Sequence, residues 1–269
     1  CREARVRVRC ALQSVGVDLS ESGVAVTIEP APSGSIDLAI AVSILVLLGR
    51  AGASGAALII GELDLNGNVR PTRGVLPALA IGEYNAVVPK DNAKEAVWSD
   101  NVVWTVDHIR DCLDSGIAAP TSRSAPMPPV YPDIADVPCP SLRRVLEIAA
   151  AGRHSLLLVG PRGSGAMLAA KALAGIMPPM THEESLTITS IQSVAGLLNG
   201  GGLVGQRPFR APHHTVSATG MGGGGSPPRP GEASLAHHGV VFLEDMNECR
   251  AAVLEALGYA HRPFDIPAC

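Results

Sequence analysis

The chain has 269 residues and a formal net charge of −4, and 46% of its residues are hydrophobic but only 3% are aromatic. This composition excludes disorder throughout the chain, and the lack of a basic excess gives no sign of a global attraction to nucleic acids or membranes. The cores must be built from Ala, Val, Leu and Ile, which favours an α/β chain whose sheets are covered by helices.

The cysteines and the apolar runs narrow the class further. The six cysteines have no CxxC spacing, which argues against a zinc knuckle or a disulfide scaffold and predicts reduced thiols in the cytoplasm. The longest apolar run, 36–48, has about 13 residues, whereas about 20 are needed to cross a bilayer, so we expect a buried helix and no membrane partner. Because the chain begins with Cys1 inside a predicted helix, we expect a piece of a longer protein.

Hydrophobic periodicity predicts the elements of the first half. In chain order we expect a strand at 23–29, a helix at 36–48, a strand at 57–61, a hairpin turn at 65–68, a helix at 77–83, strands at 86–89 and 102–106, and a short helix at 109–115. The turn is predicted because Asn66-Gly67 accepts the positive φ values of tight turns. Residues 119–140, rich in Pro, Ser and Asp, predict a linker between domains at 1–118 and 141–269.

The second half is predicted to open with a helix at 142–151, followed by Ser155–Val159, a run apolar on both faces and therefore typical of a central parallel strand. Further helices are expected at 166–176 and from Glu183 onward. Residues 195–232 are dense in Gly, Pro and His and predict a long loop or hairpin insertion. A second buried strand at 239–245 ends in two acids.

A glycine-rich turn links the predicted strand at 155–159 to the helix from 166. This strand–GxxxxG–helix order is typical of a Walker A phosphate loop, whose backbone N–H groups hold phosphates. The pattern requires Lys and then Ser or Thr, but Ala166 and Met167 follow here, and they supply neither a positive charge nor a Mg²⁺ ligand. The candidate loop residues are Gly160, Pro161, Arg162, Gly163, Ser164, Gly165, Ala166 and Met167.

Two cations lie near this altered loop. Lys171 is five residues into the helix, about 7.5 Å further along its axis and on a different face from Ala166, so we do not expect it to reach the same phosphate. Arg162 is nearer, and it is either a substitute phosphate contact or a solvated surface residue.

The candidate catalytic acids are Glu244 and Asp245, which resemble the Walker B pair that positions Mg²⁺ and polarises the attacking water. The usual order is Asp then Glu. The inverted order displaces each carboxylate by about 1 Å or more. Such misplacement lowers the rate of the catalysed step about a hundredfold. The alternative interpretation is two acids that cap a strand. The two histidine pairs lack a completing Cys or Asp at a familiar spacing, so no metal site is predicted.

Three segments carry a family resemblance: RPFRAPHHT (207–215), GGGGSPPRPGEASLAH (222–237) and GVVFLED (239–245). They closely resemble the magnesium-chelatase-like AAA+ family known as YifB or ComM, and the resemblance covers nearly the whole chain up to about Leu257. It implies an α/β protein in which a Lon-protease-like (S5-type α+β) domain, incomplete at its N-terminus, precedes a partial P-loop AAA+ parallel-sheet domain. It also implies ATP and Mg²⁺ as cofactors, DNA as a partner, and assembly as a homo-hexamer or with an intact relative.

The resemblance also shows what has changed. Gly61–Arg70 and Val88–Asn92 look like the Lon-like domain, but Ile36 and Leu76 stand where Lon proteases carry the catalytic serine and lysine, so proteolysis is not expected. After Tyr259 the sequence leaves the family pattern, so we expect the sensor residues, arginine finger and helical lid to be absent. An incomplete sheet is expected to expose the apolar edge beside 240–243.

Three functions are compatible with these residues. The first is a degenerate ComM-like protein, related to DNA-remodelling ATPases, with ATP binding and hydrolysis weak or lost. The second is an active ATPase of recombination during transformation that tolerates Ala166 and Met167 through Arg162. The third is a non-enzymatic adaptor that binds DNA or a partner through Arg207, Arg210 and Arg229.

Overall fold

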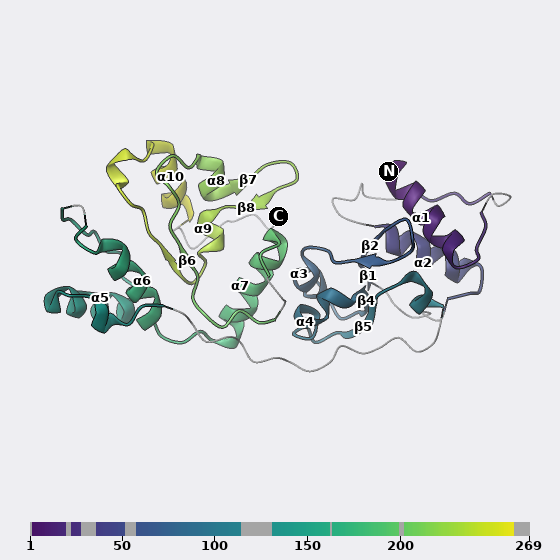
Figure 1. Ribbon diagram of the computed structural model, residues 1–269, viewed down its shortest axis with the longest axis horizontal. Coiled ribbons are helices and arrows are strands. Elements are labelled where there is room, and N and C mark those ends of the chain that lie inside the picture. Colours follow the sequence, from purple (N-terminus) through teal and green to yellow (C-terminus); the bar gives the residue numbers. More distant parts are fainter. Residues whose placement is uncertain are drawn as a thin grey trace. The chain divides into compact units, whose positions relative to one another are not determined.

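The computed structural model divides the chain into two compact units, which are described separately: Cys1–Ala125 with Gly196–Leu203, and Pro126–Ala195 with Val204–Cys269 (Figure 1). The structure describes residues 2–19, 23–27, 36–51, 58–113, 131–161, 163–198 and 202–260. Of residues 2, 259 and 260 it describes only the backbone. Within these ranges no helix is both long and apolar enough to cross a membrane.

A three-stranded parallel sheet organises the first unit, with strand order β1–β4–β5. Its strands are β1 (Leu58–Ile59), β4 (Asn85–Pro89) and β5 (Val102–Val106). Central strand β4 is buried on both faces, because Val87 packs into one core while Ala86 and Val88 pack into another. The three strands predicted for this stretch are confirmed.

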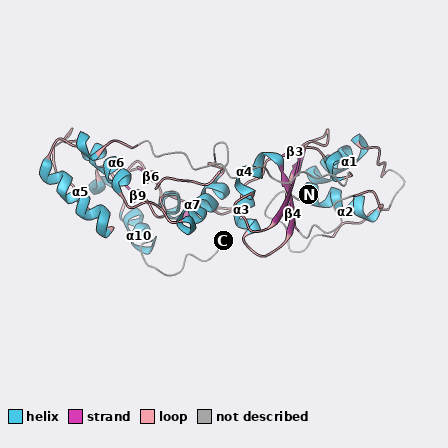
Figure 2. Ribbon diagram, turned by 90° about the horizontal axis from the view of Figure 1, so that it is seen from below, coloured by secondary structure: helices cyan, strands magenta, loops and turns pink. Residues whose placement is uncertain are grey.

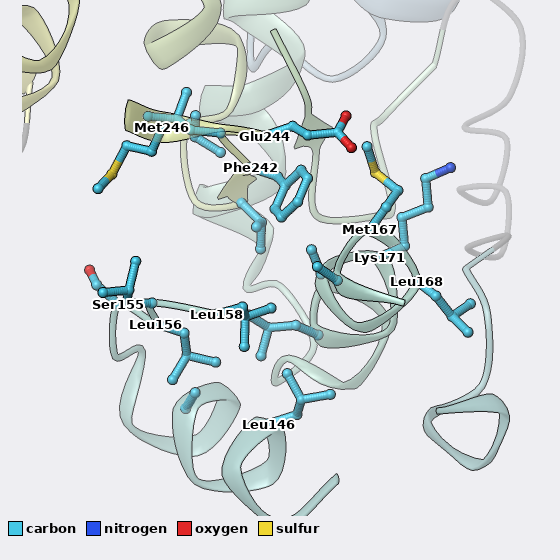
Figure 3. Close-up of a pocket in the computed structure, with 18 of the residues that line it drawn as sticks. Leu146, Ser155, Leu156, Leu158, Met167, Leu168, Lys171, Phe242, Glu244 and Met246 are labelled. Carbon is cyan, nitrogen blue, oxygen red and sulfur yellow. The ribbon is translucent and has the colours of Figure 1, made fainter. Parts of the chain in front are cut away.

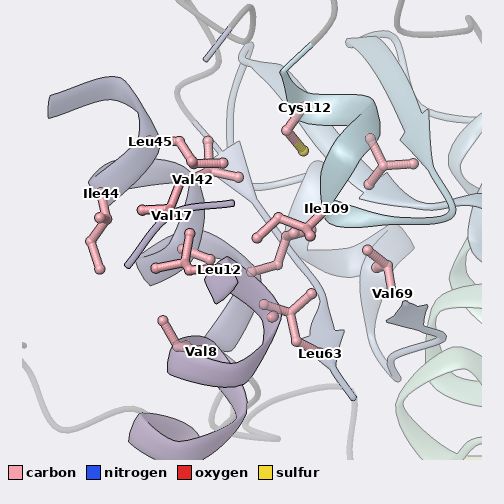
Figure 4. Packing of buried hydrophobic residues seen from close by; sticks show 14 of the residues in the cluster. Val8, Leu12, Val17, Val42, Ile44, Leu45, Leu63, Val69, Ile109 and Cys112 are labelled. Carbon is pink, nitrogen blue, oxygen red and sulfur yellow. The ribbon is translucent and has the colours of Figure 1, made fainter. Parts of the chain in front are cut away.

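Helices cover both faces of this sheet, α1 and α2 on one face and α3 and α4 on the other (Figure 2). Their bounds, with two 3₁₀ turns, are α1 (Arg2–Ser14), α2 (Asp37–Leu47), α3 (Val75–Leu79), η1 (Lys90–Asn92), α4 (Ala93–Ala96) and η2 (Ile109–Cys112). The larger core joins Leu12 of α1 and Leu45 of α2 to Ile109 and Cys112 (Figure 4). Burial raises the pKa of the Cys112 thiol to about 12, so this cysteine acts as an apolar packing group. The helix predicted at 36–48 is confirmed as α2.

The predicted hairpin is also confirmed. It consists of β2 (Glu62–Leu63) paired antiparallel with β3 (Val69–Arg70). The Asp64 carboxylate accepts hydrogen bonds from the backbone N–H groups of Asn66 and Asn68 at 2.9 Å and from the Asn68 side-chain amide at 2.8 Å. These bonds, above all the one from the Asn68 side chain, hold the pKa of Asp64 below its ordinary value. Gly67 has a φ of 92°, the left-handed conformation that the Asn-Gly pair was expected to provide.

Other predictions for the first half are corrected. Residues 23–27 form no strand, and Val24 and Val26 are 41% and 49% exposed, because alternation makes a strand only where a neighbouring strand pairs with its backbone. Residues 28–29 lie outside the described residues, as do 114–130, which hold the end of the helix predicted at 109–115 and most of the linker. The helix predicted at 77–83 is α3, which begins earlier, after Gly74 in the left-handed conformation (φ 75°), and also ends earlier, at Leu79.

Two groups of elements make up the second unit. In one group, η3, α5 and α6 enclose a small core around Leu146, Ala169 and Ala172. The other group contains α7, a parallel strand pair, an antiparallel hairpin and three further helices. The bounds are η3 (Ile134–Asp136), α5 (Pro140–Gly152), α6 (Ala166–Ile176), α7 (His182–Ala195), β6 (Phe209–Arg210), α8 (Ala218–Gly222), β7 (Gly223–Gly224), β8 (Arg229–Pro230), α9 (Glu232–Leu235), β9 (Val240–Val241), η4 (Met246–Glu248) and α10 (Ala251–Ala260). The three helices predicted around the glycine turn are confirmed as α5, α6 and α7.

The predicted central strand at 155–159 is not formed. These residues have no regular structure, and Leu157 and Val159 are 73% and 89% exposed. A parallel strand needs a neighbour, and the two parallel strands described in this unit, β6 and β9, pair with each other. The strand predicted at 239–245 is accordingly shortened to β9, and the loop predicted at 195–232 contains β6, α8, β7, β8 and the start of α9.

Helix α2 provides a test of where the first core lies. Leu45→Ala should lower the free energy of unfolding by about 2–5 kcal/mol, because Leu45 is fully buried and its truncation leaves a cavity. Leu47→Ala, two residues further along the same helix, should change it by less than about 0.5 kcal/mol, because Leu47 is 81% exposed. Urea unfolding followed by tryptophan fluorescence measures both, since Trp98 and Trp104 both belong to the first unit. Equal costs for the two variants would contradict this core.

Candidate functional site

The glycine turn and the start of α6 form one side of the candidate site. Gly163 and Gly165 have φ values of 80° and 85°, in the left-handed region that favours glycine, and an added Cβ at either position would meet no atom within 4 Å. Backbone conformation, and not crowding, therefore requires these glycines. Gly165 is the N-cap of α6, and its carbonyl accepts the N–H of Ala169 at 2.9 Å. Arg162 lies outside the described residues.

Two half-buried apolar side chains, Ala166 and Met167, occupy the first turn of α6. Lys171 lies four residues after Met167, so the two share one face of the helix, and Figure 3 shows their side chains next to each other. The five-residue spacing within α6 places Lys171 on a different face from Ala166, as expected, and Met167 is the residue that shares its face. The four-residue spacing between Met167, the second altered position, and Lys171 is the sequence signal that identifies Lys171 as a cation near this site.

The two candidate acids lie across from α6. Glu244 and Asp245 lie two residues beyond the end of β9, after Phe242 and Leu243, and both are exposed. Asp245 has a φ of 49°, and its carbonyl accepts the N–H of Glu248 at 2.8 Å as η4 begins. No ion pair joins either acid to another described residue. In Figure 3 the Glu244 carboxylate lies on the side of the pocket where Met167 and Lys171 project.

A cleft of about 1660 Å³ lies between the glycine turn and the two acids, and both line it. One wall consists of residues 155–161 with α5 and α6, and the opposite wall of β9 with the residues that follow it. The structure thus brings together the described residues of the predicted Walker A and Walker B segments, which lie about 80 residues apart in sequence.

The three arginines predicted to bind phosphates differ in their surroundings. Arg207 is 4% exposed, and its guanidinium donates to the carbonyls of Pro178 and His238, both at 2.7 Å, and to Glu184 at 3.0 Å. Arg210 forms a bidentate pair with Glu232 at 2.6 and 2.8 Å, and this hydrogen bonding raises the pKa of Arg210. Arg229, in β8, is exposed and has no ion pair with any described residue. Two of the three guanidinium groups are therefore engaged within the fold.

Glu184, near the start of α7, connects several segments of the second unit. Its carboxylate pairs with Arg153 and Arg207, each at 3.0 Å, and lies 3.5 Å from Nδ1 of His238. It also accepts the backbone N–H of Thr181 at 3.1 Å, while the Thr181 hydroxyl accepts the N–H of Glu184 at 3.1 Å. Desolvation alone would raise the pKa of Glu184, but the Thr181 hydrogen bond and the two arginines outweigh it and hold the pKa below its ordinary value.

The histidine pairs are packed ring against ring, with centroids 4.0 Å apart for His213 and His214 and 4.1 Å apart for His237 and His238. Burial, followed by the nearby His238, lowers the pKa of His237. Among the described residues no group of three His, Cys, Asp or Glu side chains is placed to hold a metal ion.

Comparisons with known proteins match both units. Residues 133–263 match the family described as magnesium chelatase, subunit ChlI, and residues 1–92 match the family described as subunit ChlI of Mg-chelatase. An uncharacterized protein of Mycobacterium tuberculosis H37Rv is 38% identical over 275 residues, covering 95% of this chain and 55% of the relative. The uncharacterized protein YifB of Salmonella typhimurium is 36% identical and the competence protein ComM of Haemophilus influenzae 34% identical, each covering 95% of this chain and 54% of the relative. The chain spans about half the length of the curated relatives it matches.

The burial of Arg207 can be tested against the more exposed Arg210. Arg207→Gln should destabilise the second unit by about 3 kcal/mol or more, because it breaks the buried pair with Glu184 and removes the charged donor to two carbonyls. Arg210→Gln should cost about 1 kcal/mol or less, since the Arg210 side chain is 36% exposed. Hydrogen exchange of the α7 amides measures both effects. A smaller cost for Arg207→Gln than for Arg210→Gln would contradict the assignment.

The lowered pKa of Glu184 predicts a pH dependence of stability. A carboxylate with a depressed pKa contributes its full stabilisation above its ordinary pKa of about 4.3 and loses it as the pH falls through the folded value. Glu184→Gln should therefore destabilise the second unit at neutral pH, and its difference from the unaltered chain should shrink below about pH 4.3. Hydrogen exchange of α7 measured over this pH range tests the expectation, with the exposed neighbour Glu183→Gln as the matched control. A difference that stays constant down to the acid limit would refute the role of the Glu184 charge.

Proposed function

The chain belongs to the magnesium-chelatase-like YifB/ComM family, and on this premise we propose that it is a ComM-like AAA+ protein whose ATP binding and hydrolysis are weak or lost. One observation carries the proposal. At the start of α6, where a phosphate loop needs an ammonium and a hydroxyl, the side chains of Ala166 and Met167 line the cleft.

The residues present fit ATP and Mg²⁺ only in part. The left-handed glycines and the start of α6 suit the backbone of a degenerate phosphate loop, and the exposed carboxylates of Glu244 and Asp245 suit a divalent cation. The missing ammonium removes a charge-assisted hydrogen bond worth about 1.5–3 kcal/mol, which corresponds to a loss of about 10- to 150-fold in affinity. The inverted order of the acids works against the chemical step in addition.

An active ATPase is the second candidate, and Lys171 is the observation that favours it. Lys171 is exposed, lines the cleft and shares a helix face with Met167. It lies one turn beyond the position of the usual hydroxyl residue, about 6 Å further along the helix axis. An ammonium group at this place is a substitute cation for a phosphate that sits deeper in the cleft.

The first unit is proposed to be a Lon-like domain that serves as a structural or interaction module. Neither position matched to the catalytic dyad carries a nucleophile or a base: Leu76 is buried in α3, and Ile36 precedes α2. The neighbouring Asp37 is buried and pairs with Arg7 at 2.6 Å, which joins α1 to α2. A role in competence is included in the proposal because one relative is named as a competence protein. DNA and a hexamer of like subunits are included from the family resemblance of the sequence motifs alone.

Restoring the two loop residues tests this proposal. The unaltered chain should bind Mg-ATP weakly or undetectably, whereas Ala166→Lys/Met167→Thr should gain at least about tenfold in affinity, because the ammonium and hydroxyl regain their phosphate and Mg²⁺ contacts. Calorimetric titration measures the affinity. Ala151→Lys, at an exposed position of α5 outside the cleft, is the control for added charge.

Two outcomes separate the candidates. Tight binding and turnover by the unaltered chain, lost on Lys171→Gln, would establish the active ATPase and exclude the degenerate one. Gain of binding only in the double variant, with no effect of Lys171→Gln, is the result expected here.

A further inference from the structure

One carboxylate oxygen of the second unit is shared by two basic side chains from different segments. Oε1 of Glu184 accepts a hydrogen bond from the Arg153 guanidinium at 3.0 Å and lies 3.5 Å from Nδ1 of His238. Oε2 is occupied by Arg207 at 3.0 Å and by the backbone N–H of Thr181 at 3.1 Å. Arg153 ends α5, which belongs to one wall of the cleft, and His238 lies just before β9, which belongs to the other. A single oxygen therefore connects the two walls.

The two residues that share this oxygen also have an unusual backbone. Arg153 and His238 have φ values of 53° and 57°, in the left-handed region that residues other than glycine seldom adopt. Such conformations persist where the surrounding contacts impose them, and they are typical of segments that switch between two states. The backbone on both sides of Oε1 is thus held away from its preferred conformation.

The surroundings of the two arginines decide which of them can leave Glu184. Arg207 is fixed, because its side chain is 3% exposed and its guanidinium also donates to the carbonyls of Pro178 and His238. The Arg153 side chain is 56% exposed, so water can replace its carboxylate partner at little cost. A further positive charge beside Glu184 should therefore displace Arg153 and leave Arg207 in place.

His238 can supply this charge under mild conditions, because histidine changes its charge between about pH 5 and 8. Its ring packs on that of His237 with centroids 4.1 Å apart, and burial, followed by the nearby His238, lowers the pKa of His237. The pair should thus take up one proton in this range, on the ring that faces Glu184. The other titratable or charged residues nearby are His154 after Arg153, His182 and Glu183 of α7, Glu232 of α9, which pairs with Arg210, and the exposed Arg229 of β8.

From this geometry we propose that Glu184 is a proton-controlled latch between the two walls of the cleft. While His238 is neutral, Oε1 binds Arg153 and holds the end of α5 to α7. Once His238 takes up a proton from water, Oε1 binds His238 and releases Arg153 to solvent. Glu184 stays ionised throughout, since a carboxylate with a depressed pKa titrates below about pH 4.3. The latch uses neither the glycine turn nor the two acids, so it stands or falls separately from the proposal on ATP.

Hydrogen exchange of the last turn of α5 in the full chain, measured at pH 8 and pH 5, tests the latch. At pH 8 Arg153→Gln should lower the protection of the amides of residues 151–154 about two- to fivefold, because it removes an exposed ion pair. At pH 5 it should have no effect, because the pair is already broken. Each variant is compared with its parent at the same pH and at low ionic strength, since salt screens exposed pairs.

Two histidine variants identify the group that takes up the proton. In a His238→Asn background the effect of Arg153→Gln should be as large at pH 5 as at pH 8, and asparagine tolerates the left-handed conformation of this position. His154→Asn, next to Arg153, is the matched control and should preserve the pH dependence. The inference is overturned if Arg153→Gln has no effect at pH 8 or an equal effect at both pH values. It is also overturned if the pH dependence survives His238→Asn or disappears in His154→Asn.

Discussion

The buried ion pair between Arg207 and Glu184 is the interaction on which the second unit depends. Arg207 lies just before β6, and Glu184 lies in the first turn of α7. The Arg207 guanidinium also donates to the carbonyl of His238, just before β9. The Arg207 side chain therefore fixes the point at which β6 and β9 begin to pair. The position of Glu244 and Asp245 at the cleft depends on it, because only two residues separate these acids from the end of β9.

The burial of the Arg207 guanidinium also explains why arginines that were predicted to bind nucleic acid stabilise the fold instead. A buried guanidinium must have hydrogen-bond partners for its five N–H groups, and carbonyls at helix and loop ends supply them at little cost in side-chain order. The second arginine of the same motif binds Glu232 in a fork-to-fork geometry for a similar reason. The charged side chains of Arg207 and Arg210 thus stabilise the wall of the cleft that contains β9.

The sequence predicted best what is decided locally. Helix α6 begins after Gly165 and ends before Pro178-Pro179, and Asn66-Gly67 marks the turn of the hairpin, so both could be found from neighbouring positions. Residues 107–109 also hydrogen-bond to this hairpin, which the local pattern does not show. The run at 155–159 could not be placed in the same way, because a parallel strand exists only if distant residues supply its neighbours. Thr181-x-x-Glu184 follows the known pattern of a helix-capping pair and could have identified Glu184. The burial of Arg207 had no such signal, since its carbonyl partners are 28 to 31 positions away.

The conformation of the glycine turn has an evolutionary consequence. Gly163 and Gly165 fix the turn through their own backbone preferences, and no side chain at 166 or 167 is required to hold it. Substitutions at 166 and 167 leave the two glycines that set the turn in place, so selection for a folded chain does not by itself preserve a lysine and a hydroxyl residue there. A lineage that no longer depends on nucleotide turnover can therefore lose both residues of the loop while each intermediate sequence still folds.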